Sequence, residues 1–269
     1  MLAIGHSSDG RVATVTLNRP DKRNALNQEL VLELDSALHS LAADEYLRAV
    51  ILTGAGNVFS AGADLDALDS MQTASFETNL EDSKALANLF LTMREHPLLL
   101  VAKVNGHAIA GGCGLVSACD MSFVNREAKL GFTETRIGFV PALVSVLLKG
   151  KISDTHARDL LLSGKLIRAD EALNMGLINV VCSSAQLDSD VRSYVASFCR
   201  NTSRQAVAVT KKLLCGSGLP SLSDLLNEAA IVNAEARSLP DCKKGIAAFL
   251  RKEAAPWTVD YEKDHRDPA

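Results

Sequence analysis

The sequence predicts an α/β fold built from stacked ββα turns, because one pattern recurs three times along the chain. Runs at 12–17 (VATVTL), 49–53 (AVILT) and 98–104 (LLLVAKV) each indicate a strand. The first alternates β-branched residues, and the other two are continuously apolar, as in strands buried on both faces. A turn of small or turn-forming residues and then a helical pattern follow each run. This recurrence favours one supersecondary unit stacked on itself.

The composition limits the class of protein. The 269 residues suffice for one large domain or for a domain with a helical appendage, and 47% hydrophobic with 22% charged residues is typical of a globular chain. A net charge of −4 and a pI of about 5.9 argue against a nucleic-acid partner. Neither a membrane-spanning run nor a signal peptide is visible, so we expect a cytoplasmic protein without a membrane partner.

The cysteines indicate neither disulfides nor a metal site. All six lack a C-x-x-C partner, and no histidine stands at metal-ligand spacing from any of them. We therefore expect free, mostly buried thiols in a reducing cytosol and no bound metal.

The first two units differ in the helices that follow their strands. After a turn at 18–21, residues 24–42 carry apolar side chains at the spacing of an amphipathic helix. After the second strand, the small residues 60–63 precede a helix beginning near Asp64. Residues 65–96 are polar-rich and helical in tendency, which predicts a candidate mobile cover.

The third unit, Lys103–Asp120, is almost stripped of large side chains between its strand and its helix. Glycines at 106, 111, 112 and 114 let the backbone approach a ligand or another element, and 115–119 suits a buried helix. In a strand followed by a glycine-rich turn and a helix, the free N–H groups at the start of the helix point in one direction. Such a group of donors can bind an anion or stabilise a developing negative charge. Taken by itself, the pattern is equally consistent with close packing of a helix on a sheet.

The second half of the chain alternates short strands and helices before it becomes mainly helical. We expect strands at 121–124, 129–132 and 177–181 and helices at 142–148, 155–163 and 168–175, the last closed by Gly176. From about 187 to 250 we expect helices with breaks at Ser203, 216–220 and Pro240.

Two of the small-residue turns could together form one anion-stabilising hole. An oxygen that gains negative charge during a reaction is stabilised by two N–H donors, and backbone amides supply them without reorganisation. We expect these donors to be the amides of Ala63 and Gly111, one from each turn. Gly54-x-Gly56 does not continue as a dinucleotide fingerprint, and the phosphate-binding P-loop motif is absent.

Four short motifs occur in register along the chain: NALN at 24–27, SAGADL at 60–65, NGHAIAGGCGL at 105–115 and LGFTETRIG at 130–138. Together they resemble the crotonase family, the enoyl-CoA hydratases and isomerases, within a likeness running from about residue 12 to residue 252. The resemblance implies a crotonase-like spiral of ββα turns over 1–200 and a C-terminal helical trimerisation region over 201–269. It also implies an acyl-CoA thioester substrate, a homotrimer or dimer of trimers, and no cofactor besides the substrate's own CoA.

The resemblance also assigns site residues position by position. It places the oxyanion hole on Ala63 and Gly111. It places the grip on CoA at Arg23, Ala25, Ala61, Asp64 and Leu65, and at Phe249 and Lys252, whose positions often reach a CoA of the neighbouring subunit.

The carboxylates depart from the family pattern. Hydratases of the family typically use two glutamates that share a water; the second maps onto Glu134, and the first would fall at position 114, where this chain has Gly114. A lone carboxylate can still take and return a proton, as in family isomerases with one glutamate. The missing glutamate and the Pro141-Ala142 turn resemble the branch that contains bacterial methylglutaconyl-CoA hydratases. The missing acid could be replaced by Asp66, Asp69, Glu77 or Glu81.

Three functions remain open at this stage. The first is a hydratase that adds water to a short- or branched-chain 2-enoyl-CoA in fatty acid or branched-chain amino acid breakdown, with Glu134 as acid and base. The second is an isomerase that shifts the double bond with Glu134 alone, and the third is a non-catalytic acyl-CoA-binding homologue. Without the resemblance, Glu134 would more commonly be a solvated carboxylate beside Arg136. By the same reasoning we expect structural roles for His107, Cys113 and Ser117.

Overall fold

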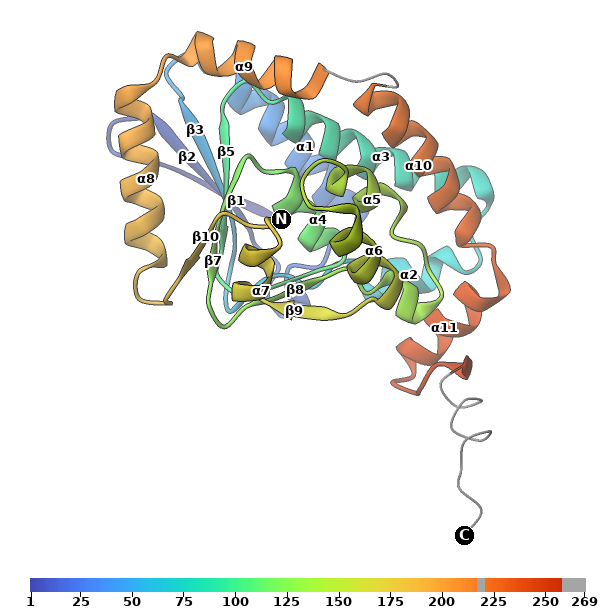
Figure 1. Cartoon of the computed structure of the whole chain (residues 1–269). Helices are drawn as coiled ribbons and strands as arrows, with labels where there is room; N and C mark the ends of the chain where they lie inside the picture. Colours follow the sequence, from blue (N-terminus) through green and yellow to red (C-terminus); the bar gives the residue numbers. More distant parts are fainter. Residues whose placement is uncertain (217–220, 258–269) are drawn as a thin grey trace.

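Two β-sheets form the centre of the molecule (Figure 1). The computed structural model describes residues 1–216 and 221–257. The larger sheet has the order β1 (Leu2–His6), β2 (Val12–Leu17), β3 (Ala49–Gly54), β5 (Leu99–Val104), β7 (Met121–Asn125) and β10 (Val180–Cys182). The smaller sheet has the order β4 (Val58–Ser60), β6 (His107–Ile109), β8 (Lys129–Gly131) and β9 (Leu166–Arg168).

The chain alternates between the two sheets, which gives the spiral. Strand β3 continues into β4, β5 into β6 and β7 into β8, so each turn adds one strand to each sheet. The strands contributed by successive turns pair in parallel, while β1 and β9 pair antiparallel at the sheet edges. The predicted α/β fold of stacked ββα turns is therefore confirmed.

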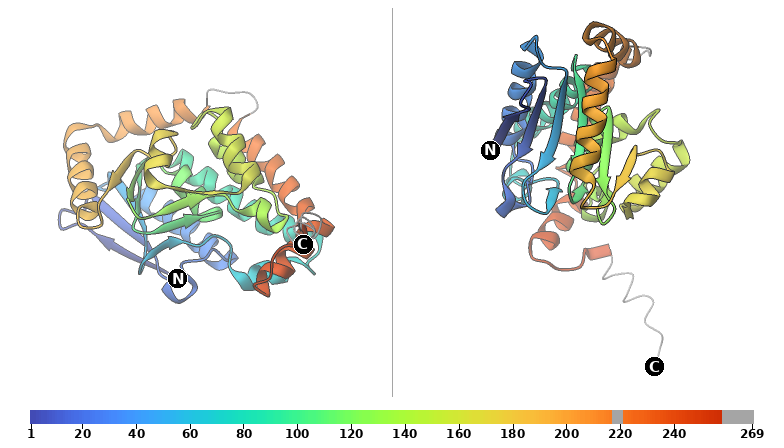
Figure 2. Two further views of the ribbon diagram at one scale, coloured as in Figure 1. Left: turned by 60° about the horizontal axis from the view of Figure 1, so that its bottom comes forward. Right: turned by 90° about the vertical axis from the view of Figure 1, so that its left-hand side faces the viewer.

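Helices cover the sheets on both sides. They are η1 (Pro20–Lys22), α1 (Gln28–Ala43), α2 (Leu65–Met71), α3 (Phe76–Glu95), α4 (Gly111–Ala118), η2 (Glu134–Ile137), α5 (Ala142–Leu148), α6 (Asp154–Ser163), α7 (Ala169–Asn174), α8 (Leu187–Asn201), α9 (Arg204–Gly216), α10 (Leu222–Ala236) and α11 (Pro240–Leu250). Helix α8 covers the outer face of the larger sheet through Val191 and Val195, which pack on Val101 and Phe123 (Figure 2). The opposite face packs on α1, α3 and α4 in the main core.

The C-terminal helices pack on the core and not only on one another. Helix α10 runs beside α3 and also packs on α5, while α11 packs on α2 and η2 (Figure 1). Helices therefore occupy the C-terminal region as expected, whereas its role in trimerisation stays a prediction. The described helices include none that is both long and apolar enough to span a membrane.

Several element boundaries differ from expectation for local reasons. The helix expected over 24–42 begins at Gln28, because the Asn27 side chain caps it by accepting the Leu30 N–H. The helix expected over 115–119 begins earlier, at Gly111, and the strand expected over 177–181 is shorter and begins later, at Val180–Cys182. The three-residue strands β4, β6 and β9 were not expected, since they are too short to show a period. The break expected at 216–220 lies largely outside the described residues.

Candidate active site

Asn24 fixes the first loop of the site. Its buried side chain donates to the carbonyls of Ala55 at 2.9 Å and Val58 at 2.8 Å, and its Oδ1 accepts the Arg19 N–H at 2.9 Å. Its backbone is left-handed, with φ 53°. These contacts tie 24–27 to the strands of the second unit, where the next loop begins.

The second loop is paired directly with the first. The Leu26 N–H donates to the Gly62 carbonyl at 2.7 Å, and the Asp64 N–H donates to the Leu26 carbonyl at 2.9 Å. In such a parallel bridge the N–H of the intervening residue, Ala63, points away from Leu26. Ala63 is exposed, and its N–H has no hydrogen-bond partner within the described parts of the chain.

Gly111 supplies a second free amide at the start of α4. The preceding Ala110 has φ 50° and ψ −123°, a conformation rare for a residue with a side chain. The Ala110 N–H is used by the Gly131 carbonyl at 2.8 Å, and the first bond inside the helix runs from the Gly114 N–H to the Ala110 carbonyl at 3.0 Å. The Gly111 N–H therefore lies at an open helix N-terminus.

The structure brings these two turns into contact. A Cβ added to Gly62 would lie 3.0 Å from the Ala110 Cβ and 3.0 Å from the Ile109 carbonyl oxygen. A Cβ added to Gly111 would lie 3.1 Å from Leu26 Cδ1. Small residues are needed here because the two backbones meet, which is the arrangement that one hole with two amide donors requires.

Glu134 opens η2, three residues after the strand β8 that pairs with β6. Its Oε2 is buried and has no hydrogen-bond partner within the described residues. Burial raises the pKa of Glu134 to about 7, against an ordinary 4.5, and only the hydrogen bond from its own backbone opposes this shift. A buried carboxylate with one oxygen unpaired among the described residues and a pKa near neutrality is suited to accept and return a proton.

The thiol of Cys113, on α4, lies within electrostatic reach of Glu134. Burial raises the pKa of this thiol to about 12, the hydrogen bond to Gly131 lowers it, and the negative charge of Glu134 raises it further. Cys113 is fully buried and thus structural, as expected. Ser117 also has a structural role, since its hydroxyl donates to the Cys113 carbonyl at 2.9 Å.

The position of the absent first glutamate is filled by apolar side chains. A Cβ added to Gly114 would lie 2.7 Å from Phe90 Cζ and 2.9 Å from Val144 Cγ1, and both side chains are buried. A carboxylate could not stand at 114 without displacing them. No sequence pattern marks this pair, because both residues occupy ordinary apolar positions of helices.

Five of the predicted CoA-binding residues lie on the two paired loops. The Arg23 carbonyl accepts the Ala61 N–H at 3.0 Å, which holds these two residues together. Arg23 is exposed and left-handed, with φ 52°, while Leu65 leaves 52% of its surface exposed at the start of α2. Ala25, in contrast, is buried, and only its backbone is used, by Arg19 at 2.6 Å.

Asp64 turns its side chain into the protein. Its Oδ2 lies 2.7 Å from Arg19 Nη2, and its Oδ1 accepts the Asp66 N–H at 3.0 Å, which caps α2. Burial alone would raise the pKa of Asp64, but the Asp66 N–H and the Arg19 guanidinium outweigh it, so the pKa is lowered. This side chain holds the loop, and a contact with CoA would come from its backbone.

Phe249 and Lys252 lie at the end of α11. Phe249 leaves 48% of its surface exposed, and Lys252 is left-handed with φ 59°. The neighbouring Leu250 packs on the cluster that contains Leu68, so this end of α11 lies beside α2 of the same chain. Their contact with CoA stays a prediction.

Four carboxylates considered as replacements for the missing acid all face solvent. Asp66 pairs with the Lys22 ammonium at 3.0 Å, and Asp69 accepts the Gln72 amide at 3.1 Å. Glu77 and Glu81 are exposed on α3. They have no observed contact with Glu134 or with the two amides, so none of them is assigned a part in the chemistry.

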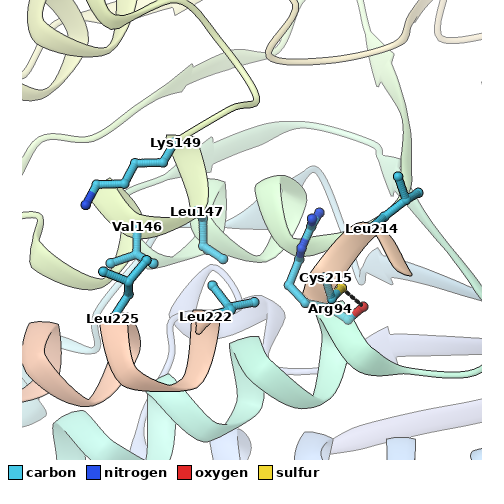
Figure 3. A pocket seen from close by; sticks show the side chains of 8 residues that line it. All are labelled: Arg94, Val146, Leu147, Lys149, Leu214, Cys215, Leu222 and Leu225. Atoms are coloured by element: carbon cyan, nitrogen blue, oxygen red, sulfur yellow. Dashed lines mark hydrogen bonds between the residues drawn. The ribbon is translucent and has the colours of Figure 1, made fainter. Parts of the chain in front are cut away.

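A cavity of about 180 Å³ lies among α3, α5, α9 and α10 (Figure 3). It is lined by Arg94, Val146, Leu147, Lys149, Leu214, Cys215, Leu222 and Leu225. None of these is a predicted site residue, so the candidate active site is defined by the amides and Glu134 and not by this cavity.

Comparison with known proteins shows the family to which the chain belongs. The family described as "Enoyl-CoA hydratase/isomerase" matches residues 7–260. A Thermus thermophilus protein named "Putative enoyl-CoA hydratase" is 42% identical over 90% of this chain and 96% of its own length. The "Short-chain-enoyl-CoA hydratase" of Clostridium acetobutylicum is 31% identical over 91% and 93%.

A solved structure extends the likeness to three dimensions. The crystal structure of an enoyl-CoA hydratase from Mycobacterium avium superposes with a TM-score of 0.84 at 31% identity, covering 95% of this chain and 98% of that one. The match to the methylglutaconyl-CoA hydratase branch stays a prediction. The chain is thus a member of the enoyl-CoA hydratase/isomerase family of enzymes, within the crotonase superfamily.

Proposed function

We propose that the protein hydrates a short- or branched-chain 2-enoyl-CoA. The observation that carries the proposal is the buried Oε2 of Glu134, which has no hydrogen-bond partner within the described residues. The thioester oxygen would lie between the amides of Ala63 and Gly111, which stabilise the negative charge it gains as an enolate. The CoA portion would run along the loops that carry Arg23 and Leu65.

One carboxylate can complete the reaction in two steps. In the first, the Glu134 carboxylate takes a proton from water while the water oxygen bonds to the β-carbon and the double-bond electrons move to the thioester oxygen. In the second, the protonated Glu134 gives that proton to the α-carbon as the enolate collapses, so atoms and charges balance. A pKa of about 7 lets the same group perform both transfers near neutral pH. The proposed reaction needs no cofactor.

A second candidate, double-bond isomerisation, is favoured by Gly114. Phe90 and Val144 fill the space that a side chain at 114 would enter, so no second carboxylate comes from that position. On a 3-enoyl-CoA, Glu134 would remove the α-proton and return it to the γ-carbon. This route uses the same amides and the same single carboxylate.

The two reactions are separated by the substrate on which they act. We expect loss of enoyl absorbance with crotonyl-CoA in water for the hydratase, and a gain of that absorbance with a 3-enoyl-CoA for the isomerase. Glu134→Gln should lower either rate by about 10²–10⁴-fold while acyl-CoA binding is kept. Thermal stabilisation by acyl-CoA without turnover of either substrate would instead identify a binding protein.

The assembly and location are part of the same proposal. We propose a homotrimer or a dimer of trimers in which the C-terminal helices over 201–269 form the contacts, and a cytoplasmic location, which the bacterial relatives support. Sedimentation of the full chain would test the first, since a monomer at micromolar concentration would contradict it. Fractionation of the source cells would test the second, since recovery in an organelle or membrane fraction would contradict it.

A further inference from the structure

Arg237, directly after α10, has a charged side chain that is buried inside the protein. Only 4% of its surface is exposed, and its Nε is buried without a partner within the described residues. Burying a guanidinium costs free energy unless its donors are paired, and an apolar side chain is the simpler way to fill a core. A buried arginine with an unused donor therefore calls for a role beyond filling space.

The guanidinium joins three segments around the candidate active site. Its Nη2 lies 2.7 Å from the Asp82 carboxylate of α3, and its Nη1 donates to the Asn79 Oδ1 at 3.1 Å. Its Cζ lies 5.8 Å from the centre of the Phe139 ring, within the range of a cation–π contact. Figure 1 shows α10 running beside α3 and turning toward α11 at this point.

Phe139 connects Arg237 to the turn that carries Glu134. The Phe139 N–H donates to the Glu134 carbonyl at 3.0 Å, so the residue whose ring lies under the guanidinium is hydrogen-bonded through its backbone to the first residue of η2. Helix α11 packs closely on the same turn. A Cβ added to Gly138 would lie 2.5 Å from the Asp241 carbonyl oxygen, and a Cβ added to Gly245 would collide with the Ile137 carbonyl oxygen. The turn that carries Glu134 is therefore held from outside by α10 and α11.

We propose that Arg237 is a positioning residue: it anchors Phe139 to α3 and thereby holds Glu134 at the two amides and away from bulk water. The proposal rests on the proposed function for its kinetic part. Arg237 itself does not touch the substrate.

The raised pKa of Glu134 depends on the exclusion of water and not on the charged groups around η2. The Cys113 thiol of α4 lies within electrostatic reach of Glu134, and the elements packed on η2 carry further titratable side chains, namely Asp154, His156, Arg158 and Asp159 on α6 and Asp241, Lys243 and Lys244 on α11. In the described structure none of these shifts the pKa of Glu134, whose elevation comes from burial. Loosening η2 should therefore lower that pKa by admitting water.

The test uses the full chain with Arg237→Met, Arg237→Lys, Phe139→Leu and the double variant Arg237→Met/Phe139→Leu. Arg126→Met is the matched control, since it removes an exposed ion pair with Asp170 at 3.0 Å.

We expect Arg237→Met and Phe139→Leu each to lower kcat on the enoyl-CoA about tenfold with little change in KM, because misplacing a reacting group by a fraction of an ångström lowers the rate. The double variant should be no slower than the slower single variant, because both changes remove one contact. The kcat of Arg237→Lys should lie between those of the wild type and Arg237→Met, since lysine keeps the positive charge but lacks the planar guanidinium.

A second readout does not depend on turnover. The infrared C=O band of protonated Glu134, isolated by subtracting the spectrum of Glu134→Gln, should titrate near pH 7 in the wild type and at lower pH in Arg237→Met. A lower melting temperature with unchanged kcat and unchanged midpoint would overturn the proposal, as would fully additive losses in the double variant. If the wild type turns over no enoyl-CoA, the proposed function fails, and the infrared midpoint alone decides on Arg237. Should Arg237→Met fail to fold, Arg237→Lys and Phe139→Leu give the same comparison.

Discussion

Glu134→Gln should make the protein more stable at alkaline pH while it lowers turnover by about 10²–10⁴-fold. A pKa of about 7 in the folded chain against 4.5 means that folding opposes ionisation of this carboxyl. The folded state therefore binds more protons than the unfolded state between these values, so stability falls as pH rises through that window and is constant above it. The loss of folding free energy caused by ionising Glu134 is almost absent below pH 4 and reaches about 3 kcal/mol above pH 7. This value follows from about 1.4 kcal/mol for each unit of pKa difference between the folded and unfolded chains.

The glutamine variant removes this pH-dependent cost. Between pH 5 and pH 8, linkage gives a change of roughly 2.5 kcal/mol in the difference between Glu134→Gln and wild type. Urea unfolding of both proteins at the two pH values and one protein concentration measures it. An equal stability difference at pH 5 and pH 8 would refute the reasoning, because it would show that the Glu134 carboxyl is as well solvated in the folded chain as in the unfolded one.

Three further predictions concern the same site. The kcat/KM on an enoyl-CoA should rise as pH increases through about 7, because the base form of Glu134 starts the reaction; a profile flat from pH 5.5 to 8.5 would contradict it. Gly114→Ala should lower the free energy of unfolding by about 1–3 kcal/mol through contact with Phe90 and Val144, and Phe90→Leu should restore part of it, measured by urea unfolding against Gly5→Ala, where nothing lies within 4 Å. Gly62→Ala should lower kcat/KM about tenfold or more by pushing the two amide-bearing turns apart, whereas Gly150→Ala, at a similarly positive φ with open space around it, should keep wild-type activity; equal losses in both would show that strain alone is responsible.

Much of the fold was predictable because its signals are local. The apolar runs at 49–53 and 98–104 are long enough to indicate buried strands, and the small residues after them indicate turns where backbones meet. The short strands β4 and β6 were not predictable, because three residues show no period and their pairing depends on contacts between different turns of the spiral.

The site was predictable where it depends on backbone and not where it depends on side-chain packing. The small residues at 60–63 and 110–114 indicated two turns with free amides, and the structure brings those turns into contact. What fills the space at position 114 was not predictable, since Phe90 and Val144 reach Gly114 from separate helices. The contact of Arg237 with Phe139 likewise joins residues 98 positions apart, and neither has a local pattern that marks it.

The central claim is that two backbone amides and one carboxylate converge on a single acyl-CoA, and a crystal structure of the protein with a bound acyl-CoA tests it most directly. The account predicts the thioester oxygen about 3 Å from the amide nitrogens of both Ala63 and Gly111, with the Glu134 carboxylate facing the α- and β-carbons. A thioester bound away from either amide, or a Glu134 carboxylate turned into solvent in that complex, would contradict it.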